Sequence, residues 1–139
     1  MQIKRLHPEA ILPSYAHPGD AGMDLYSCEQ LVIPPQERRL IKTGISLAIP
    51  PGYVGLIWDR SGLASKHGLK SMAGVIDTGY RGEVCVLIHN LSLGPFTVEK
   101  GMKISQMLIQ PVTQMELEEV ASLDDTDRGA GGFGSTGLR

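Results

Sequence analysis

Short runs of apolar residues, separated by turn residues, recur along most of the chain. The two richest runs are ISLAI at residues 45–49 and VCVLI at residues 84–88, which are β-branched and too short for a helix of usual length. Proline and glycine punctuate the runs. The pattern predicts strands at residues 30–33, 38–42, 45–49, 53–58, 83–90 and 103–112, and with them an all-β fold of the β-barrel or jelly-roll type.

Helical periodicity is confined to residues 61–67, where Ser61 is a candidate N-cap for one or two turns. The acidic stretch at residues 116–127 is expected to form a solvated strap. The segment that follows, RGAGGFGSTGLR, is rich in glycine and therefore predicted to be mobile. We predict one barrel domain, residues 1–127, with a flexible C-terminal lid at residues 128–139.

Composition narrows the classes of partner. The chain has 139 residues, 42% of them hydrophobic, which is enough for a single real core. Its net charge is −2, so no broad basic face is available to bind a nucleic-acid backbone. Polymeric DNA or RNA is therefore not an expected partner.

Cysteine and histidine usage adds two expectations. Cys28 and Cys85 lie far apart, and no charged-then-apolar leader opens the sequence. We therefore expect an intracellular, reducing location, which is the cytoplasm, with the nucleus as an alternative in a eukaryote, and no membrane partner. The four histidines do not fall at zinc-ligand spacing with one another or with the cysteines, so a protein-ligated transition metal is not expected.

The C-terminal segment carries residues that suit a nucleotide. Arg128 offers a guanidinium, Phe133 a ring, and Ser135 and Thr136 two hydroxyls, a set that fits an anion and a flat base. Residues 129–134 also spell G-x-G-x-x-G, but that fingerprint needs a strand before it and a helix after it, and the sequence ends five residues later. The segment is interpreted as a lid, and the alternative is a tail without function.

Two upstream segments allow a phosphate or metal role. In AGMDLYS, Asp24 comes two residues after Gly22 and precedes an apolar residue, and an aspartate so close to a glycine is typical of a turn residue as well as of a ligand. In DRSGLASK, Arg60, the Ser61 hydroxyl and the N–H groups that open a short helix suit phosphate. The alternative there is a surface pair between Arg60 and Asp59 beside an ordinary cap.

Two further segments allow a catalytic role. In GVIDTGYRGEVC, apolar residues lead into Asp77, where a carboxylate at the mouth of a buried hairpin can act as a general base, and Tyr80 can stack on a sugar or ring. Asp-Thr-Gly is equally a plain turn. In GMKISQ, Gln106 is a polar residue in a strand-like run, and by itself this pattern indicates an outward-facing position.

In this order and at these separations, the five segments resemble the trimeric deoxyuridine triphosphatases (dUTP diphosphatases). The family motifs appear as AGMDLYS, DRSGLA, GVIDTGYRGE, GMKISQ and RGAGGFGSTG, which together reach from residue 21 to residue 137. The fourth motif commonly reads G-D-R-I-A-Q, and Met102, Lys103 and Ser105 replace three of its letters here. Asp59 stands where a small residue or proline is more usual.

The resemblance implies a distorted jelly-roll homotrimer with three shared active sites. In that arrangement the hairpin from Asp77 to Cys85 comes from one subunit, the loop of Arg60, Ser61 and Gly62 together with Gln106 from a second, and the lid from a third. It also implies hydrolysis of dUTP to dUMP and pyrophosphate, which keeps uracil out of DNA and supplies dUMP for thymidylate synthesis. The implied cofactor is Mg²⁺, held mainly by triphosphate oxygens.

The resemblance also assigns a role to each candidate residue. Asp77 orients and deprotonates the water that attacks the α-phosphorus, and Arg60 and Gln106 complete the catalytic set. Asp24 touches the metal only through water, or serves the sugar and the site architecture. The substrate-binding residues are Ser61, Gly62, Gly74, Val75, Ile76, Tyr80, Cys85, Arg128, Phe133, Gly134, Ser135 and Thr136.

Two other functions compete with the hydrolase. The related dCTP deaminase shares the fold, but it needs a catalytic glutamate ten residues beyond the aspartate, where this chain has Leu87. The second alternative is a nucleotide-sensing trimer without turnover. The presence of Asp77, Arg60, Gln106 and the lid favours the hydrolase over the sensor.

Overall fold

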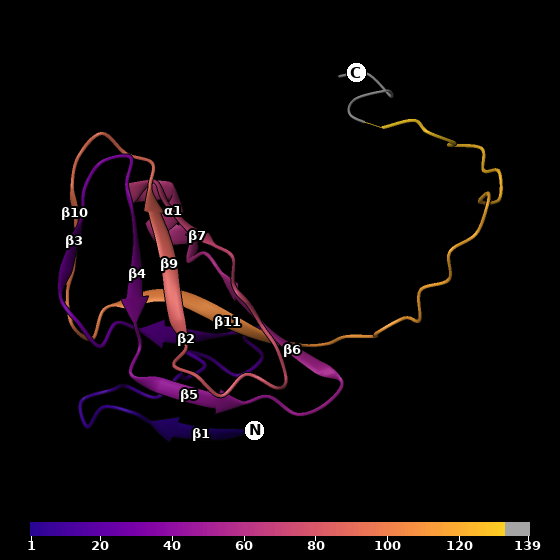
Figure 1. The fold of residues 1–139 in the computed structure, drawn as a ribbon. Coiled ribbons are helices and arrows are strands. Elements are labelled where there is room, and N and C mark those ends of the chain that lie inside the picture. The colour runs from indigo at the N-terminus through magenta and orange to yellow at the C-terminus, as the bar shows by residue number, and fades with distance from the viewer. Residues whose placement is uncertain (133–139) are drawn as a thin grey trace.

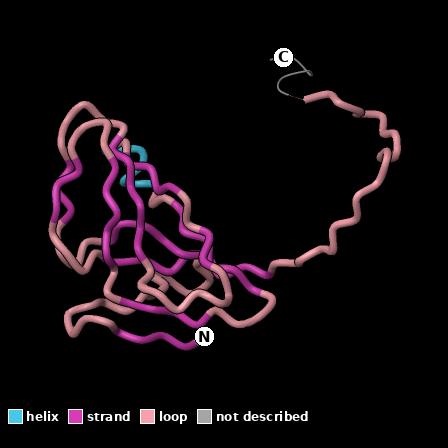
Figure 2. The backbone as a smooth tube through the Cα atoms, in the orientation of Figure 1, coloured by secondary structure: helices cyan, strands magenta, loops and turns pink. Residues whose placement is uncertain are grey.

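The fold is a small antiparallel β-barrel with a single short helix at one end, seen in a computed structural model that describes residues 1–132 (Figures 1 and 2). The elements are β1 (Gln2–Arg5), β2 (Gly22–Tyr26), β3 (Leu31–Ile33), β4 (Arg38–Lys42), β5 (Ile45–Ala48), β6 (Tyr53–Trp58), α1 (Ser61–His67), β7 (Leu69–Met72), β8 (Val75–Ile76), β9 (Cys85–Asn90), β10 (Phe96–Val98) and β11 (Lys103–Pro111). The predicted all-β class and jelly-roll architecture are confirmed.

Two sheets build most of the barrel. One sheet has the strand order β2-β11-β6-β8 and the other β4-β9-β7, and the pairs β1-β5 and β10-β3 close the remaining sides. Every one of these pairings is antiparallel. The longest strand, β11, lies between β2 and β6, so it brings residues from the first, second and fourth motifs side by side.

The core follows from the alternation of side chains along each strand. In β9, Val86, Ile88 and Asn90 are buried, while the intervening residues are half-exposed, as the two-residue period of a strand requires. Asn90 is satisfied inside the core because its side chain donates to the carbonyls of Ile33 and Gly94. The fully buried set also includes Leu25, Ile33, Ile41, Ile45, Ile49, Val84, Val98, Ile104 and Met107.

The six strands predicted from the sequence are all present, as β3, β4, β5, β6, β9 and β11, with ends that agree within two residues. Five strands were not predicted. β1 has every side chain exposed, β10 and β8 are very short, β7 has two polar residues between its two apolar ones, and β2 has a charged residue at its centre, so none carries a clear apolar pattern.

The predicted helix at residues 61–67 is also confirmed, but its predicted cap is wrong. Ser61 is the first helical residue, and Arg60 holds the N-cap position in extended conformation (φ −87°, ψ 124°) without a side-chain capping bond. The other end follows a common rule, because Gly68 has a left-handed φ of 65° and its N–H donates to the Ala64 carbonyl.

The predicted hairpin around Asp77 is a second correction. β8 pairs with β6, whereas β9 pairs with β4 and β7, so the strands that flank Asp77 belong to different sheets. Residues 77–84 form a crossover loop between the sheets, because β8 ends after two residues and the chain must change direction to reach β9. Gly74, at φ 97°, starts this region and lets its carbonyl approach the Ile57 N–H to 2.8 Å.

After β11 the chain leaves the barrel. Residues 112–130 are exposed and lie outside strands and helices, and Figure 1 shows them running away from the barrel. The division into a barrel at residues 1–127 and a lid at 128–139 stays a prediction. Within residues 1–132 the structure holds no helix of the length and apolar character that crossing a bilayer would take.

Candidate active site

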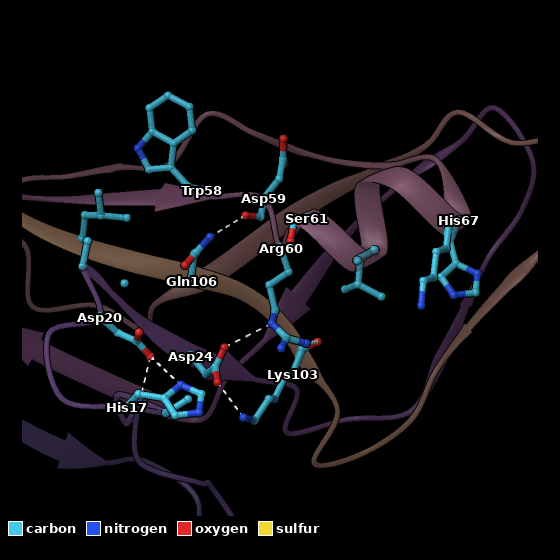
Figure 3. A pocket seen from close by; sticks show the side chains of 17 residues that line it. His17, Asp20, Asp24, Trp58, Asp59, Arg60, Ser61, His67, Lys103 and Gln106 are labelled. Atoms are coloured by element: carbon cyan, nitrogen blue, oxygen red, sulfur yellow. Dashed lines mark hydrogen bonds and ion pairs between the residues drawn. The ribbon is translucent and has the colours of Figure 1, made fainter.

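A cavity of about 780 Å³ opens between β2, β11 and the junction of β6 with α1 (Figure 3). Its walls carry three carboxylates, Asp20, Asp24 and Asp59, and three side-chain cations, Arg60, Lys66 and Lys103. Three negative charges against three positive ones leave the lining formally neutral when its histidines are neutral. Because the lining carries no net positive charge, binding an anion in this cavity requires an additional cation.

Asp24 is the buried centre of this charge network. It lies in β2 with 8% of its surface exposed, and its carboxylate contacts Arg60 Nε at 3.1 Å and Lys103 Nζ at 2.6 Å. The hydrogen bond and the charge of Asp24 raise the pKa of Lys103, so the lysine is cationic at neutral pH. A buried carboxylate with two cationic partners fixes the direction of both side chains.

Arg60 does not pair with its neighbour Asp59, so that alternative for the second motif is wrong. The Asp59 carboxylate instead accepts the Ser71 N–H at 2.5 Å and contacts Lys70 Nζ at 2.6 Å, both on β7. Arg60 turns toward Asp24, as Figure 3 shows, and also donates to the Lys103 carbonyl at 3.4 Å. The guanidinium is thus held at the cavity wall by groups from two other strands.

Gln106 is half-buried, and its amide is held in one orientation. It lies on β11 opposite Asp24 of β2 and Trp58 of β6, and its Nε2 donates to the Asp59 carbonyl at 2.8 Å. The amide oxygen lies against Gly22, where an added Cβ would be 3.0 Å from Gln106 Cδ and closer still to the oxygen. Gly22 therefore leaves the space that this amide occupies.

A second pocket, of about 380 Å³, is more apolar and lies beside the crossover loop. It is lined by Gly74, Val75, Ile76, Asp77, Tyr80 and Cys85, together with Leu40, Met72, Ala73, Glu83 and Leu87. The loop is held by its own polar contacts, since Tyr80 donates to the Glu83 carbonyl at 2.9 Å and Thr78 to the Ile49 carbonyl at 2.8 Å. Burial, and then the charge of Glu83, raises the pKa of Cys85, so its thiol is neutral at pH 7.

The structure thus divides the predicted site residues between two pockets that share no lining residue. Asp24, Arg60, Ser61, Gly62 and Gln106 line the large cavity. The crossover-loop residues line the smaller pocket, where Asp77 and Tyr80 are exposed.

The third group of predicted site residues falls in the predicted lid, residues 128–139. Arg128 lies on the segment beyond the barrel, where its Nε donates to the Gly131 carbonyl at 2.9 Å. Phe133, Gly134, Ser135 and Thr136 fall outside the described residues.

The chain also matches known proteins over nearly its whole length. The family model that matches it is described as dUTPase and covers residues 8–137. This chain belongs to the dUTPase family. Among the relatives of this dUTPase is a deoxyuridine 5'-triphosphate nucleotidohydrolase from Clostridium kluyveri, which is 55% identical over 97% of this chain and 96% of the relative.

Solved dUTPase structures share the fold. The dUTPase of Staphylococcus bacteriophage 80alpha, solved with dUpNHpp, superposes with a TM-score of 0.93 at 36% identity over 99% of this chain and 98% of that chain. A dUTPase variant from phage phi11 of S. aureus, described for its coordination of a structural Mg(II) ion, has a TM-score of 0.84 at 32% identity over 89% and 98% of the two chains.

Three positions that contact candidate site residues of this dUTPase were not predicted from its sequence. Gly22 was noted only for its place two residues before Asp24, and the space it leaves for Gln106 depends on strand pairing. Lys103 was noted as a departure from the fourth motif, without the ion pair to Asp24. Asp59 was noted for its unusual place before Arg60, and no local pattern indicates its partners on β7.

Proposed function

We propose that this chain hydrolyses dUTP to dUMP and pyrophosphate, which keeps uracil out of DNA and supplies dUMP for thymidylate synthesis. The observation that carries the proposal is the division of the surface into a charged cavity and a smaller, more apolar pocket edged by two carboxylates, Asp77 and Glu83, of which Glu83 already accepts the Gly44 N–H. That division suits a triphosphate and a nucleobase. Membership of the dUTPase family supports it, as do a relative named as a nucleotidohydrolase and a neighbour solved with dUpNHpp.

The charged cavity would bind the phosphates. Arg60 supplies a guanidinium, and the first turn of α1 supplies N–H groups at Ser61 and Gly62, which an α-helix leaves without intrahelical partners. A Cβ added at Gly62 would meet nothing within 4 Å, so this face of the turn is open to a ligand. Gln106 and the Arg128 of the lid complete the set.

The smaller pocket would bind the deoxyuridine. Main-chain N–H and C=O groups from Gly74 through Ile76 and at Cys85 can pair with uracil, whereas cytosine reverses the donors at N4 and N3 and would leave buried groups unpaired. Tyr80 packs under the sugar in this arrangement and excludes a ribose 2′-hydroxyl. Phe133 stacking on the base would add about 1–3 kcal/mol, the range for aromatic base platforms.

Asp77 would act as the general base. It is exposed on the crossover loop and borders the nucleoside pocket, so a water can reach both the carboxylate and the α-phosphorus of a bound nucleotide. In-line attack by that water, with its proton passing to Asp77, breaks the bond between the α-phosphorus and the oxygen that bridges to the β-phosphorus. Pyrophosphate is thereby released. A positioned base of this kind contributes about 10² to 10⁴ in rate.

Mg²⁺ fits as a metal held mainly by the substrate. Within residues 1–132, no group of three or more His, Cys, Asp or Glu side chains is placed to hold a metal ion, and the Asp24 carboxylate already has two cationic partners. Asp24 would therefore reach the metal through water, with triphosphate oxygens as the direct ligands. The metal supplies positive charge for the phosphates, which the neutral lining of the cavity lacks.

The active unit would be a homotrimer with shared sites, located in the cytoplasm. One chain presents the proposed base and the proposed phosphate cations in pockets without a common residue, which suits a site completed by a neighbouring copy. The lid, carrying Arg128, Ser135 and Thr136, would close on the γ-phosphate of a bound substrate and exclude water. Static light scattering would measure three chains per particle.

Two measurements separate this proposal from its alternatives. The purified protein with Mg²⁺ should release pyrophosphate from dUTP but not from dCTP or UTP, and Asp77→Asn should lose nearly all turnover while it still binds nucleotide. Release of ammonia from dCTP would instead favour the deaminase, which position 87, a leucine, disfavours. Binding of dUTP without release of any product would favour the sensor.

A further inference from the structure

Asp59 joins three segments of the barrel at the rim of the charged cavity. Its carboxylate accepts the Ser71 N–H at 2.5 Å and contacts Lys70 Nζ at 2.6 Å, both on β7. Its main-chain carbonyl accepts the Gln106 Nε2 of β11 at 2.8 Å. Asp59 itself follows the last residue of β6, so a single residue ties the end of β6 to β11 of the same sheet and to β7 of the other sheet.

These contacts form a closed ring. Ser71, whose N–H binds the Asp59 carboxylate, also shares a hydrogen bond between its hydroxyl and that of Ser105, at 2.6 Å. Ser105 is fully buried and precedes Gln106 in β11, and Gln106 donates back to Asp59. Three hydrogen bonds closed into a ring by the backbone of these residues restrain each member more than an isolated bond does.

We propose that Asp59 is a positioning residue for the charged cavity, holding the carbonyl that orients the Gln106 amide and the backbone from which Arg60 extends. The inference rests on the proposed function, because Gln106 and Arg60 are catalytic groups only if the chain is a hydrolase. Asp59 thereby has a role at a position where the family motif usually has a small residue or proline. Asp59 does not contact the substrate in this role.

The orientation of Gln106 follows from the tether. Because Nε2 donates to the Asp59 carbonyl, the amide oxygen faces Gly22. Figure 3 shows the Gln106 side chain with its nitrogen directed toward Asp59. An amide oxygen accepts hydrogen bonds and donates none. The tethered Gln106 therefore holds its oxygen, an acceptor suited to a water or a hydroxyl, on the Gly22 side, while the second N–H of its amide stays available to donate to a phosphate oxygen.

The Asp59 side chain is 23% exposed, so the tether is protected from solvent in part. Burial raises the pKa of Asp59, but hydrogen bonds from Lys70 and from the Ser71 N–H outweigh burial and hold the pKa below its ordinary value. The carboxylate is therefore ionised at neutral pH, where it makes the stronger bond to an N–H donor.

The test compares three variants by steady-state hydrolysis of dUTP. Asp59→Ala removes both bonds to β7, Lys70→Met removes only the ion pair, and Asp59→Asn keeps an oxygen that can accept the Ser71 N–H. Because a misplacement of about 1 Å costs on the order of 10²-fold in rate, we expect kcat to fall by roughly 10- to 100-fold in Asp59→Ala, with KM changed by less than about threefold. Asp59→Asn should restore most of the lost kcat.

Glu9→Ala is the matched control. Glu9 also pairs with a lysine, Lys100, but lies on the surface outside both pockets, so its removal should leave kcat unchanged. Thermal unfolding and light scattering of each variant establish that fold and assembly are retained. If Asp59→Ala does not fold, Asp59→Leu, which has a similar side-chain shape but accepts no hydrogen bond, takes its place with the same expected loss of kcat.

A double-mutant cycle with Gln106→Ala tests the route of the effect. If Asp59 acts through Gln106, the loss in the double variant is smaller than the product of the two single losses. Single losses that multiply, or a kcat in Asp59→Ala equal to that of the parent, would overturn the inference. A parent protein that releases no pyrophosphate would instead overturn the proposed function, so the two failures are distinguishable.

Discussion

The space left by Gly22 leads to a prediction in which activity and stability separate. Gly22 begins β2 opposite Leu108 of β11, and its φ is not in the left-handed region, so alanine suits the backbone. A Cβ there would lie 3.0 Å from Gln106 Cδ and 3.2 Å from Gln106 Cβ, and nearer to the amide oxygen. Carbon atoms in contact ordinarily lie about 3.5–4.0 Å apart. The Gln106 amide must therefore move by roughly 1 Å.

The cost to stability is small because the atoms displaced most, Oε1 and Cδ, are at the end of a side chain, and the contact to Gln106 Cβ needs a shift of only a few tenths of an ångström. Loss of the hydrogen bond from Gln106 to the Asp59 carbonyl costs about 1 kcal/mol. Replacing glycine by alanine at a compatible position returns about 0.4–1 kcal/mol through the unfolded state. We therefore expect the free energy of unfolding of Gly22→Ala to equal that of the parent within about 1 kcal/mol.

The cost to activity is large because the displaced group is a proposed catalytic amide. A shift of about 1 Å corresponds to a loss on the order of 10²-fold in rate. Pyrophosphate release from dUTP gives kcat, and urea unfolding of the same preparation gives stability. Gly94→Ala is the matched control, because a Cβ at Gly94 would meet nothing within 4 Å and the residue lines neither pocket. A Gly22→Ala enzyme with kcat within threefold of the parent would refute this account of Gln106.

Three further predictions follow from single contacts. In Gly82→Ala the new Cβ would lie 2.6 Å from Tyr80 Cζ, so the ring must move, and the preference for dUTP over UTP should fall in a competition assay. A chain that stops after Asp127 should keep the melting temperature of the parent, because the hydrogen bonds of Arg128 and its described neighbours stay within residues 126–131. The same chain should hydrolyse dUTP slowly, and unchanged turnover would contradict the proposed lid. The pKa of Asp59 is lower in the folded protein than its ordinary value of 3.8, so the ionised carboxylate stabilises the fold at pH values above about 4. This stability is lost as the pH falls through the folded pKa. Asp59→Asn should therefore make unfolding less dependent on pH below about pH 4.

Strands that coincide with an apolar run between turn residues could be predicted from the sequence. β4 and β6 were placed at their observed ends, and β9 and β11 within two residues, because turn residues bound each run. β2 was missed because Asp24 interrupts its apolar residues, and a buried charge is compatible with a strand only when its partners are known.

The candidate site was predictable as a set of residues but not as an arrangement. The five motifs point to Asp24, Arg60, Asp77 and Gln106, each of which lines one of two pockets in the structure. The contacts that orient them join residues far apart in the sequence, such as Asp24 with Lys103, and arise from the pairing of β2 with β11. Local patterns hold no information on such pairs, whereas strand register does.

The separation of the two pockets has a consequence for mixtures of defective chains. In a single chain Asp77 lies beside one pocket and Arg60 beside the other, and no residue borders both. If sites form between copies as proposed, a particle that combines Asp77→Asn chains with Arg60→Ala chains contains a junction where both damaged halves meet and another where two intact halves meet. Two inactive preparations, unfolded and refolded together, would then regain part of the activity that neither has alone.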